Sequence, residues 1–152
     1  DPDNRRPVDW ETHRRLLAEI ARAEPAELVS SWRDGRIKLL VTARTLAARR
    51  RNASALSRGS YVPVPARGPA AERAVALLRH SGEQAVLACV GRFFTRKSEG
   101  WPNTVLELPA ELPKGRYEDV VSGRSVELDA RSELALAELF SLLPCALLER
   151  RQ

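Results

Sequence analysis

Apolar residues recur at a helical spacing in the first third of the chain. Over residues 10–23, Leu16, Leu17 and Ile20 lie on one stripe, and charged residues surround that stripe. Asp9 directly precedes this stretch, and aspartate is among the residues that best cap a helix N-terminus. The pattern therefore predicts a helix that starts after Asp9 and is broken at Pro25.

A second helix is expected over residues 36–51, after a short helical turn at residues 25–32. Apolar residues cover most of its circumference, which is typical of a helix packed on two sides rather than of a surface helix. Lys38 lies on the narrow polar stripe that remains. A lysine in such a helix needs a partner or an opening to water, or its long side chain carries the ammonium group to the surface.

From residue 60 onward, short apolar runs alternate with turn residues, as in antiparallel sheets. The runs at residues 73–79 and 84–92 predict a hairpin, because His80-Ser81-Gly82-Glu83 lies between them. Pro63 cannot donate to a neighbouring strand, so the strand at residues 61–64 is expected at a sheet edge. Further strands are expected at residues 104–108, 117–121, 124–128 and 144–149.

These elements indicate the fold class α+β. A helical segment at residues 1–58 is followed by an antiparallel β-sandwich at residues 60–152. Residues 134–143 suit a strand or a helix, and the alternation of leucine with alanine favours a strand. Residues 93–103 are rich in polar side chains and are expected to form an exposed loop.

The first nine residues combine two prolines with charged and amide side chains. Pro2 and Pro7 fix the backbone and lack an N–H donor, so a rigid extended loop is expected. Its carboxylate, amide and guanidinium groups suit the hydroxyls of a sugar, because each hydroxyl both donates and accepts hydrogen bonds. The alternative is an N-terminal arm held in place by ion pairs.

The composition is that of a globular protein, with 43% hydrophobic residues, 30% charged residues and a net charge of +5. No apolar run approaches the ~20 residues that span a bilayer. Residues 1–60 hold 13 Lys and Arg against 8 Asp and Glu, so all of the excess positive charge lies there. Nucleic-acid binding is not expected, because acidic residues interleave with the arginines and aromatic residues are few.

The sequence holds no methionine and starts at Asp1, so it is expected to be a piece of a longer translated chain.

Metal-binding and catalytic side chains do not group along the sequence. His13, His80 and the two cysteines lack the spacing of metal ligands, so neither a metal nor a cofactor is expected. Cys89 and Cys145 lie in apolar runs and are expected to be free thiols, which favours a reducing, cytoplasmic location. No two carboxylates are marked as the acid and nucleophile that glycosidic chemistry requires.

The three tryptophans are candidates for stacking on sugar rings. Trp10 and Trp32 are expected instead to be buried against the helices. Trp101 lies in a polar loop, so burial and sugar stacking are equally consistent with its position.

Four segments of the chain resemble one enzyme family. They are similar to the C-terminal part of maltooligosyl trehalose synthases, and they comprise the opening Asp-Pro-Asp-Asn-Arg-Arg-Pro-Val-Asp, residues 34–39, residues 42–44 and the closing residues 139–148. These enzymes belong to the amylase-type glycoside hydrolase superfamily. The resemblance runs through nearly all of the 152 residues, and the opening nonapeptide is its most specific part.

The resemblance implies that the longer protein is an intramolecular transferase of trehalose biosynthesis, a (1→4)-α-D-glucan 1-α-D-glucosylmutase. Such an enzyme converts the reducing-end α-1,4 linkage of a maltooligosaccharide into an α,α-1,1 linkage, with retaining chemistry. Its catalytic carboxylates lie earlier in the barrel, so the resemblance implies no catalytic residue in this chain and an inactive isolated piece. Residues 1–58 would then be the end of the catalytic barrel, with the rest of the barrel and the maltooligosaccharide as partners.

Five residues match family positions that border the substrate. Asp3, Asn4, Arg5 and Arg6 match the loop after the last barrel strand, and Lys38 matches a position in the helix that follows. Arg5 is the first candidate for a direct sugar contact.

A non-enzymatic interpretation remains open beside the family one. The chain would then be a β-sandwich module that binds carbohydrate or docks a partner enzyme, and Trp101 with its loop would matter most. In either case a helix at residues 36–51 packed on two sides would expose an apolar face in the isolated chain, so self-association or a partner is expected.

Overall fold

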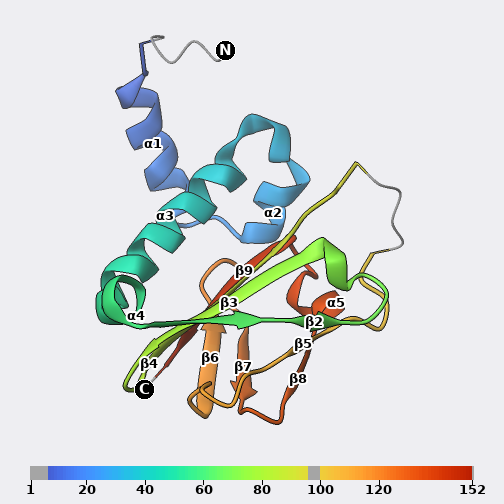
Figure 1. The fold of residues 1–152 in the computed structure, drawn as a ribbon. Helices are drawn as coiled ribbons and strands as arrows, with labels where there is room; N and C mark the ends of the chain where they lie inside the picture. Colours follow the sequence, from blue (N-terminus) through green and yellow to red (C-terminus); the bar gives the residue numbers. More distant parts are fainter. Residues whose placement is uncertain (1–6, 96–99, 152) are drawn as a thin grey trace. The chain divides into compact units, whose positions relative to one another are not determined.

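The chain forms two compact units, which divide between Ala43 and Arg44 inside the helix α3 (Arg36–Arg51). The computed structural model describes residues 7–95 and 100–151 (Figure 1). The boundary predicted between residues 58 and 60 concerns the domains of a longer protein and stays a prediction.

The first unit is helical. It holds α1 (Trp10–Ile20), α2 (Pro25–Ser30), the 3₁₀ turn η1 (Trp32–Asp34) and the first half of α3. The predicted cap is confirmed, because the Thr12 backbone N–H donates to Asp9 Oδ1 over 2.9 Å. This hydrogen bond from the Thr12 backbone also lowers the pKa of Asp9.

The predicted burial of two tryptophans is wrong. Trp10 is 68% exposed and Trp32 is 64% exposed. In α1 and α2 only Ile20 and Leu28 are buried. Helices this short enclose too little interior for two indole rings, so the aromatic surface of this unit stays open.

The second unit begins with the end of α3 and with α4 (Ala53–Arg58), a short helix that the sequence pattern did not predict. Within residues 60–95 and 100–151, nine strands follow in two antiparallel sheets. The six-stranded sheet has the order β1 (Ser60–Val64), β3 (Ala74–Ser81), β4 (Gln84–Gly91), β9 (Cys145–Arg150), β6 (Gly115–Asp119) and β7 (Ser125–Leu128). The three-stranded sheet has the order β2 (Ala66–Arg67), β5 (Val105–Glu107) and β8 (Glu133–Ala135).

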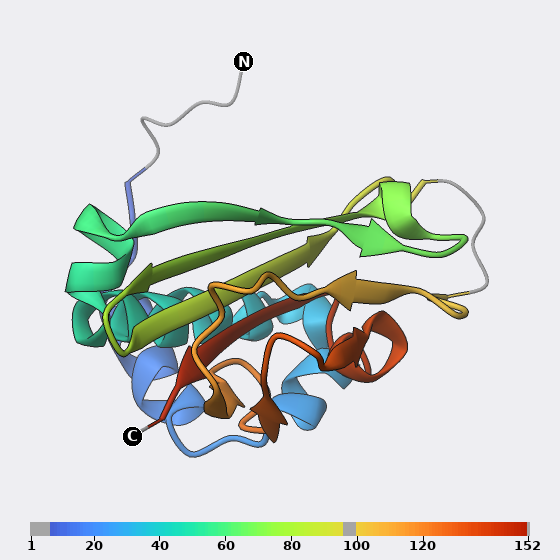
Figure 2. The same cartoon turned by 60° about the horizontal axis from the view of Figure 1, so that its bottom comes forward.

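The predicted hairpin and the predicted edge strand are both present. Figure 2 shows β1, β3 and β4 side by side, with β1 at the margin of the sheet, as Pro63 predicted. Gly82 adopts φ 56° in the turn between β3 and β4, a left-handed conformation that glycine accepts without strain. The 3₁₀ turn η2 (Ala71–Arg73) leads into β3.

One apolar core joins the two sheets into a β-sandwich, and the fold class α+β is confirmed. Leu78 and Leu87 of the larger sheet share this core with Leu106 and Leu134 of the smaller one. All four are nearly inaccessible to solvent, which is the main favourable term in the stability of this unit. None of the helices in the described residues is both long and apolar enough to cross a membrane.

Residues 134–143 differ from the predicted strand. The strand β8 ends at Ala135, and α5 (Leu136–Leu139) follows it directly. The partner strand β5 is only three residues long, and its pairing with β8 ends at Val105 and Ala135. Leu136 N then donates to Thr104 O, and Phe140 N donates to Leu136 O, so the chain turns into a helix where its strand partner ends.

The two cysteines are free thiols, as predicted. They lie on neighbouring strands, but Cys89 pairs with Ala146 and Cys145 pairs with Val90. Because adjacent residues of a strand point to opposite faces, the two sulfur atoms lie on opposite sides of the sheet. Burial raises the pKa of Cys89 to about 12, which keeps this thiol protonated and unreactive.

A buried carboxylate connects the helices to the larger sheet. The Glu149 side chain on β9 is only 2% exposed. It accepts hydrogen bonds from Arg51 Nη2 at 2.8 Å and from Asn52 Nδ2 at 2.8 Å, and Arg151 Nη1 lies 2.6 Å from it. The charge is therefore compensated by partners from the end of α3, from the residue before α4 and from the residue after β9.

We predict that Glu149→Gln lowers the free energy of unfolding by about 3 kcal/mol, because two arginines lose the charge that compensates them. Urea denaturation followed by circular dichroism measures this change. Glu111→Gln, the same substitution on an exposed turn, serves as the matched control and is expected to change stability by less than about 0.5 kcal/mol. Equal stability of the two variants would contradict the assignment.

A second ion pair predicts a pH dependence. Arg151 donates to both carboxylate oxygens of Glu118 at 3.0 Å, and this hydrogen bonding lowers the pKa of Glu118 below 4.5. A carboxylate with a depressed folded-state pKa stabilises the fold above its unfolded pKa, and this contribution is lost as pH falls through the folded value. Glu118→Gln is therefore expected to be less stable than wild type at neutral pH, and the difference is expected to shrink as the pH falls through the folded-state pKa. Urea titrations at neutral pH and at successively lower pH test this, and a pH-independent difference would contradict it.

Candidate functional site

The predicted substrate loop lies outside the described residues. Asp3, Asn4, Arg5 and Arg6 all precede residue 7, so their role stays a prediction. Lys38 is described and is exposed on the surface of α3. Its ammonium group therefore reaches water without a buried partner, and its role in binding substrate also stays a prediction.

The ring of Trp101 is partly buried rather than held out on a loop. Its ring packs edge-on against Phe140 with the centroids 4.9 Å apart, and the guanidinium of Arg73 lies 4.6 Å from its centroid. A side-chain carbon at Gly91 would lie 2.9 Å from the indole, so the ring also closes over the β4 backbone. These contacts pack the partly buried Trp101 against the sandwich core. Of the two interpretations that the sequence left open, the structure favours burial.

The first unit carries an open apolar groove. It is lined by Trp10, His13, Arg14 and Leu17 of α1 and by Leu39 of α3. Leu17 is 41% exposed, and most of the Trp10 side chain is accessible to water. His13 is hydrogen-bonded to Asp9 O over 2.7 Å, which holds its ring beside Trp10. The groove is mostly apolar and exposed, as a docking surface is.

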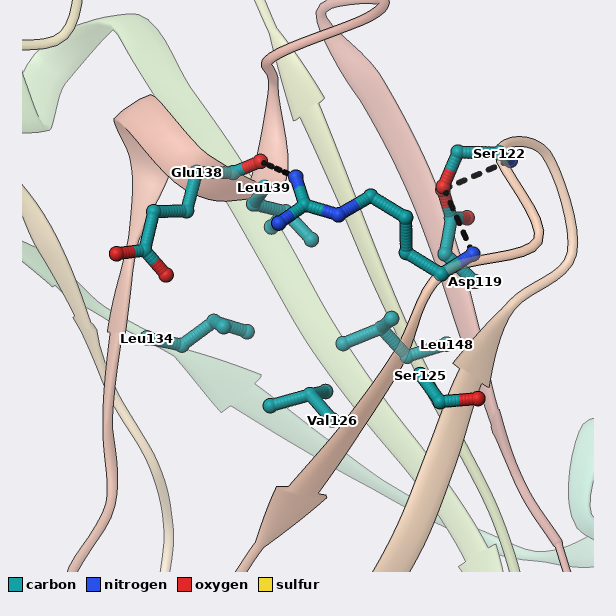
Figure 3. Close-up of a pocket in the computed structure, with 9 residues that line it drawn as sticks. Asp119, Ser122, Ser125, Val126, Leu134, Glu138, Leu139 and Leu148 are labelled. Atoms are coloured by element: carbon teal, nitrogen blue, oxygen red, sulfur yellow. Dashed lines mark hydrogen bonds between the residues drawn. The ribbon is translucent and has the colours of Figure 1, made fainter.

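The second unit holds a pocket of about 160 Å³ between the β6–β7 turn and α5 (Figure 3). Its floor is apolar. Leu134 and Leu148 are 6% and 2% exposed, and Val126 and Leu139 complete the lining. Figure 3 shows Leu134, Val126 and Leu148 below Glu138, with Leu139 beside Glu138.

The rim of this pocket carries a cation, a carboxylate and a hydroxyl. Arg124 Nη1 donates to the backbone oxygen of Glu138 at 2.9 Å and to Ser141 Oγ at 2.7 Å, so its guanidinium is held against α5. The Glu138 carboxylate lines the same pocket, and none of the described residues donates a hydrogen bond to it. Ser125, the first residue of β7, supplies the hydroxyl, and its Oγ accepts a hydrogen bond from Arg116 Nη2 at 3.0 Å.

The second carboxylate beside the pocket belongs to Asp119, which is 4% exposed. Its Oδ1 accepts from the backbone N–H groups of Val121 at 3.2 Å and Leu147 at 3.0 Å. Its Oδ2 accepts from the backbone N–H of Ser122 at 3.0 Å and from the hydroxyl of the same residue at 2.5 Å. With all of these donors in place, Asp119 holds the turn after β6 and is not available as a nucleophile or general base.

The pocket therefore has room for a small ligand. It does not offer the acid and nucleophile pair of glycosidic hydrolysis, because Asp119 is engaged by hydrogen-bond donors. Among the described residues, His, Cys, Asp and Glu side chains form no group of three that could hold a metal ion. The sequence pattern did not predict this site, because periodicity gave no signal that Arg124 would meet Glu138 across the pocket.

No family model matches the chain. The chain is 36% identical over 151 residues to the putative maltooligosyl trehalose synthase of Mycobacterium tuberculosis, in the sequences from strains CDC 1551 and H37Rv. The match covers 99% of this chain and 16% of each relative. The chain thus spans about a sixth of the length of these relatives.

A solved structure agrees with the sequence match. A mutant of maltooligosyltrehalose synthase from Arthrobacter ramosus superposes with a TM-score of 0.74 at 30% sequence identity. The match covers 99% of this chain and 18% of that one. The similarity in sequence and the similarity in fold therefore extend over the same, nearly complete, length of this chain.

Proposed function

We propose that this chain, which is homologous to a part of maltooligosyl trehalose synthase, is the C-terminal part of such an enzyme. The enzyme would convert the reducing-end α-1,4 linkage of a maltooligosaccharide into an α,α-1,1 linkage in the cytoplasm. The observation that carries the proposal is the 36% identity to named relatives over 99% of the chain. The fold supports it, with a TM-score of 0.74 to a solved enzyme of that name.

In this proposal the first unit completes the catalytic barrel. The groove beside Trp10 and the exposed ring of Trp32 supply apolar surface that the unit itself leaves uncovered. A monomeric domain rarely exposes two tryptophans to this extent, and packing against the rest of the barrel would bury them. Residues 1–58 would then be the last barrel segment, and residues 60–152 the domain that stabilises it.

The chain would contribute to substrate binding without performing the chemistry. Asp3, Asn4, Arg5 and Arg6 would border the bound maltooligosaccharide from the loop before α1, and Lys38 would reach toward it from α3. The pocket beside the β6–β7 turn is lined by Glu138 and by an Asp119 that is fully engaged by donors, which supports a non-catalytic role for this part. The catalytic carboxylates would then lie in the longer protein.

The direct test is an assay of the full-length gene product that contains this chain. Incubation with maltopentaose is expected to remove reducing ends without releasing glucose as the main product, and to create an α,α-1,1 linkage visible by NMR. The 152-residue chain alone is expected to show no conversion. Release of shorter reducing oligosaccharides by the full-length protein would overturn the proposal.

Arg5→Ala in the full-length protein is expected to lower kcat/KM by about 10- to 100-fold, the equivalent of losing a hydrogen bond from a charged donor. The loss arises because a guanidinium in the substrate loop donates to sugar hydroxyls. Arg22→Ala, at an exposed arginine beyond the end of α1, is the matched control and is expected to leave kcat/KM unchanged. Equal activity of Arg5→Ala and wild type would remove Arg5 from the substrate site.

The isolated chain is expected to self-associate through the uncovered surface of the first unit. The double substitution Trp10→Ser and Trp32→Ser should weaken this association by at least about tenfold, because burying one large apolar side chain contributes ~1.5–3 kcal/mol. Sedimentation equilibrium measures the change. Tyr61→Ser, at an isolated exposed aromatic on β1, is the control and should leave association unchanged. A monomeric wild-type chain would contradict this prediction.

A further inference from the structure

We propose that the pocket between the β6–β7 turn and α5 is an accessory subsite that binds one glucose unit of an α-glucan chain. The inference concerns a binding site in the second unit, separate from the substrate loop at residues 3–6. It rests on the proposed function for the identity of the sugar, and on the geometry of the pocket for the existence of the site.

The size of the pocket limits its occupant. Its volume of about 160 Å³ is below the ~300 Å³ at which pockets for drug-sized ligands begin. A single six-membered ring is the scale of group that such a space accepts. Arg124, Ser125 and Glu138 at its rim are exposed, so the rest of a glucan chain is able to leave the pocket. The site would therefore hold a chain end rather than an extended oligosaccharide.

The floor suits the apolar face of a sugar ring. Leu134 and Leu148 are almost fully buried beneath the pocket, and Val126 is half-buried beside them. A pyranose ring presents C–H groups on its faces and hydroxyls around its edge. Contact between such a face and aliphatic side chains removes apolar surface of both from water, which is favourable.

The rim suits the hydroxyls at the edge of the ring. Each hydroxyl donates one hydrogen bond and accepts others, so its best partners are a donor and an acceptor placed side by side. The Arg124 guanidinium supplies donors, because only its Nη1 is occupied by Glu138 O and Ser141 Oγ. The Glu138 carboxylate supplies acceptors in the same rim. A guanidinium already held against α5 loses little conformational entropy when a ligand binds.

The same groups disfavour other small ligands. A phosphate or a carboxylate would be attracted by Arg124 but repelled by the neighbouring Glu138. A purely apolar group would leave the guanidinium and the carboxylate without partners as it excluded water from them. A neutral ligand that both donates and accepts avoids both costs, and a glucose unit is such a ligand.

The test is titration of the isotopically labelled 152-residue chain with maltotriose, followed by ¹H–¹⁵N NMR. Shifts are expected at Ser125, Val126, Glu138 and Leu139, with a dissociation constant in the millimolar range. Glu138→Ala is expected to weaken binding at least tenfold. Glu127→Ala, at an exposed glutamate of β7 outside the pocket lining, is the matched control and should bind like wild type. Val126→Phe, which fills the pocket, should abolish the shifts, and its own spectrum reports whether it folds.

Each other outcome overturns the proposal. Absence of shifts at the pocket, shifts that survive Glu138→Ala, or binding of inorganic phosphate in place of maltotriose would each do so. Equal binding of cellotriose, which is β-1,4-linked, would overturn the assignment to α-glucans. The transferase assay of the full-length protein separates the two proposals. A wild-type protein without conversion of maltopentaose would remove the proposed function while leaving the titration to decide on the pocket.

Discussion

The buried carboxylate of Glu149 fixes how the helices of residues 44–58 pack on the larger sheet. Apolar contact alone is non-directional, so it does not define one orientation of a helix on a sheet. Arg51 and Asn52 must approach within hydrogen-bonding distance of Glu149, and this requirement is met in one arrangement only. An unpaired charge on a side chain that is only 2% exposed would be strongly unfavourable. Moving the helices away from the sheet would leave Glu149 unpaired, so their packing is fixed.

A second buried acid, Asp119, fixes the turn after β6 by accepting hydrogen bonds, as Glu149 fixes the helices. Its oxygens hold the backbone of Val121 and Ser122, and Arg44 Nη1 donates to Val121 O at 2.7 Å. The turn is thereby rigid, and the chain leaves it with Arg124 directed to α5. The pocket follows from this arrangement, because it is the space between a fixed turn and α5, the short helix that follows β8.

The two units differ in how completely they bury their own apolar surface, and this difference fits a part of a larger enzyme. The second unit has a continuous core shared by both sheets, as a domain with its own stability does. The first unit exposes Trp10 and Trp32 and buries few residues. The proposed transferase role gives the first unit a barrel to complete, and the proposed subsite gives the second unit a role in holding glucan.

The sequence by itself determined the features that depend on near neighbours: the cap at Asp9, the hairpin turn at Gly82 and the edge position of Pro63. Each follows from backbone chemistry within a few residues. Only the tertiary structure decided the helix at residues 136–139, the separation of the two thiols and the meeting of Arg124 with Glu138. These depend on where a distant strand ends and on which face of a sheet each residue occupies, and periodicity along one chain carries no information about such long-range pairing.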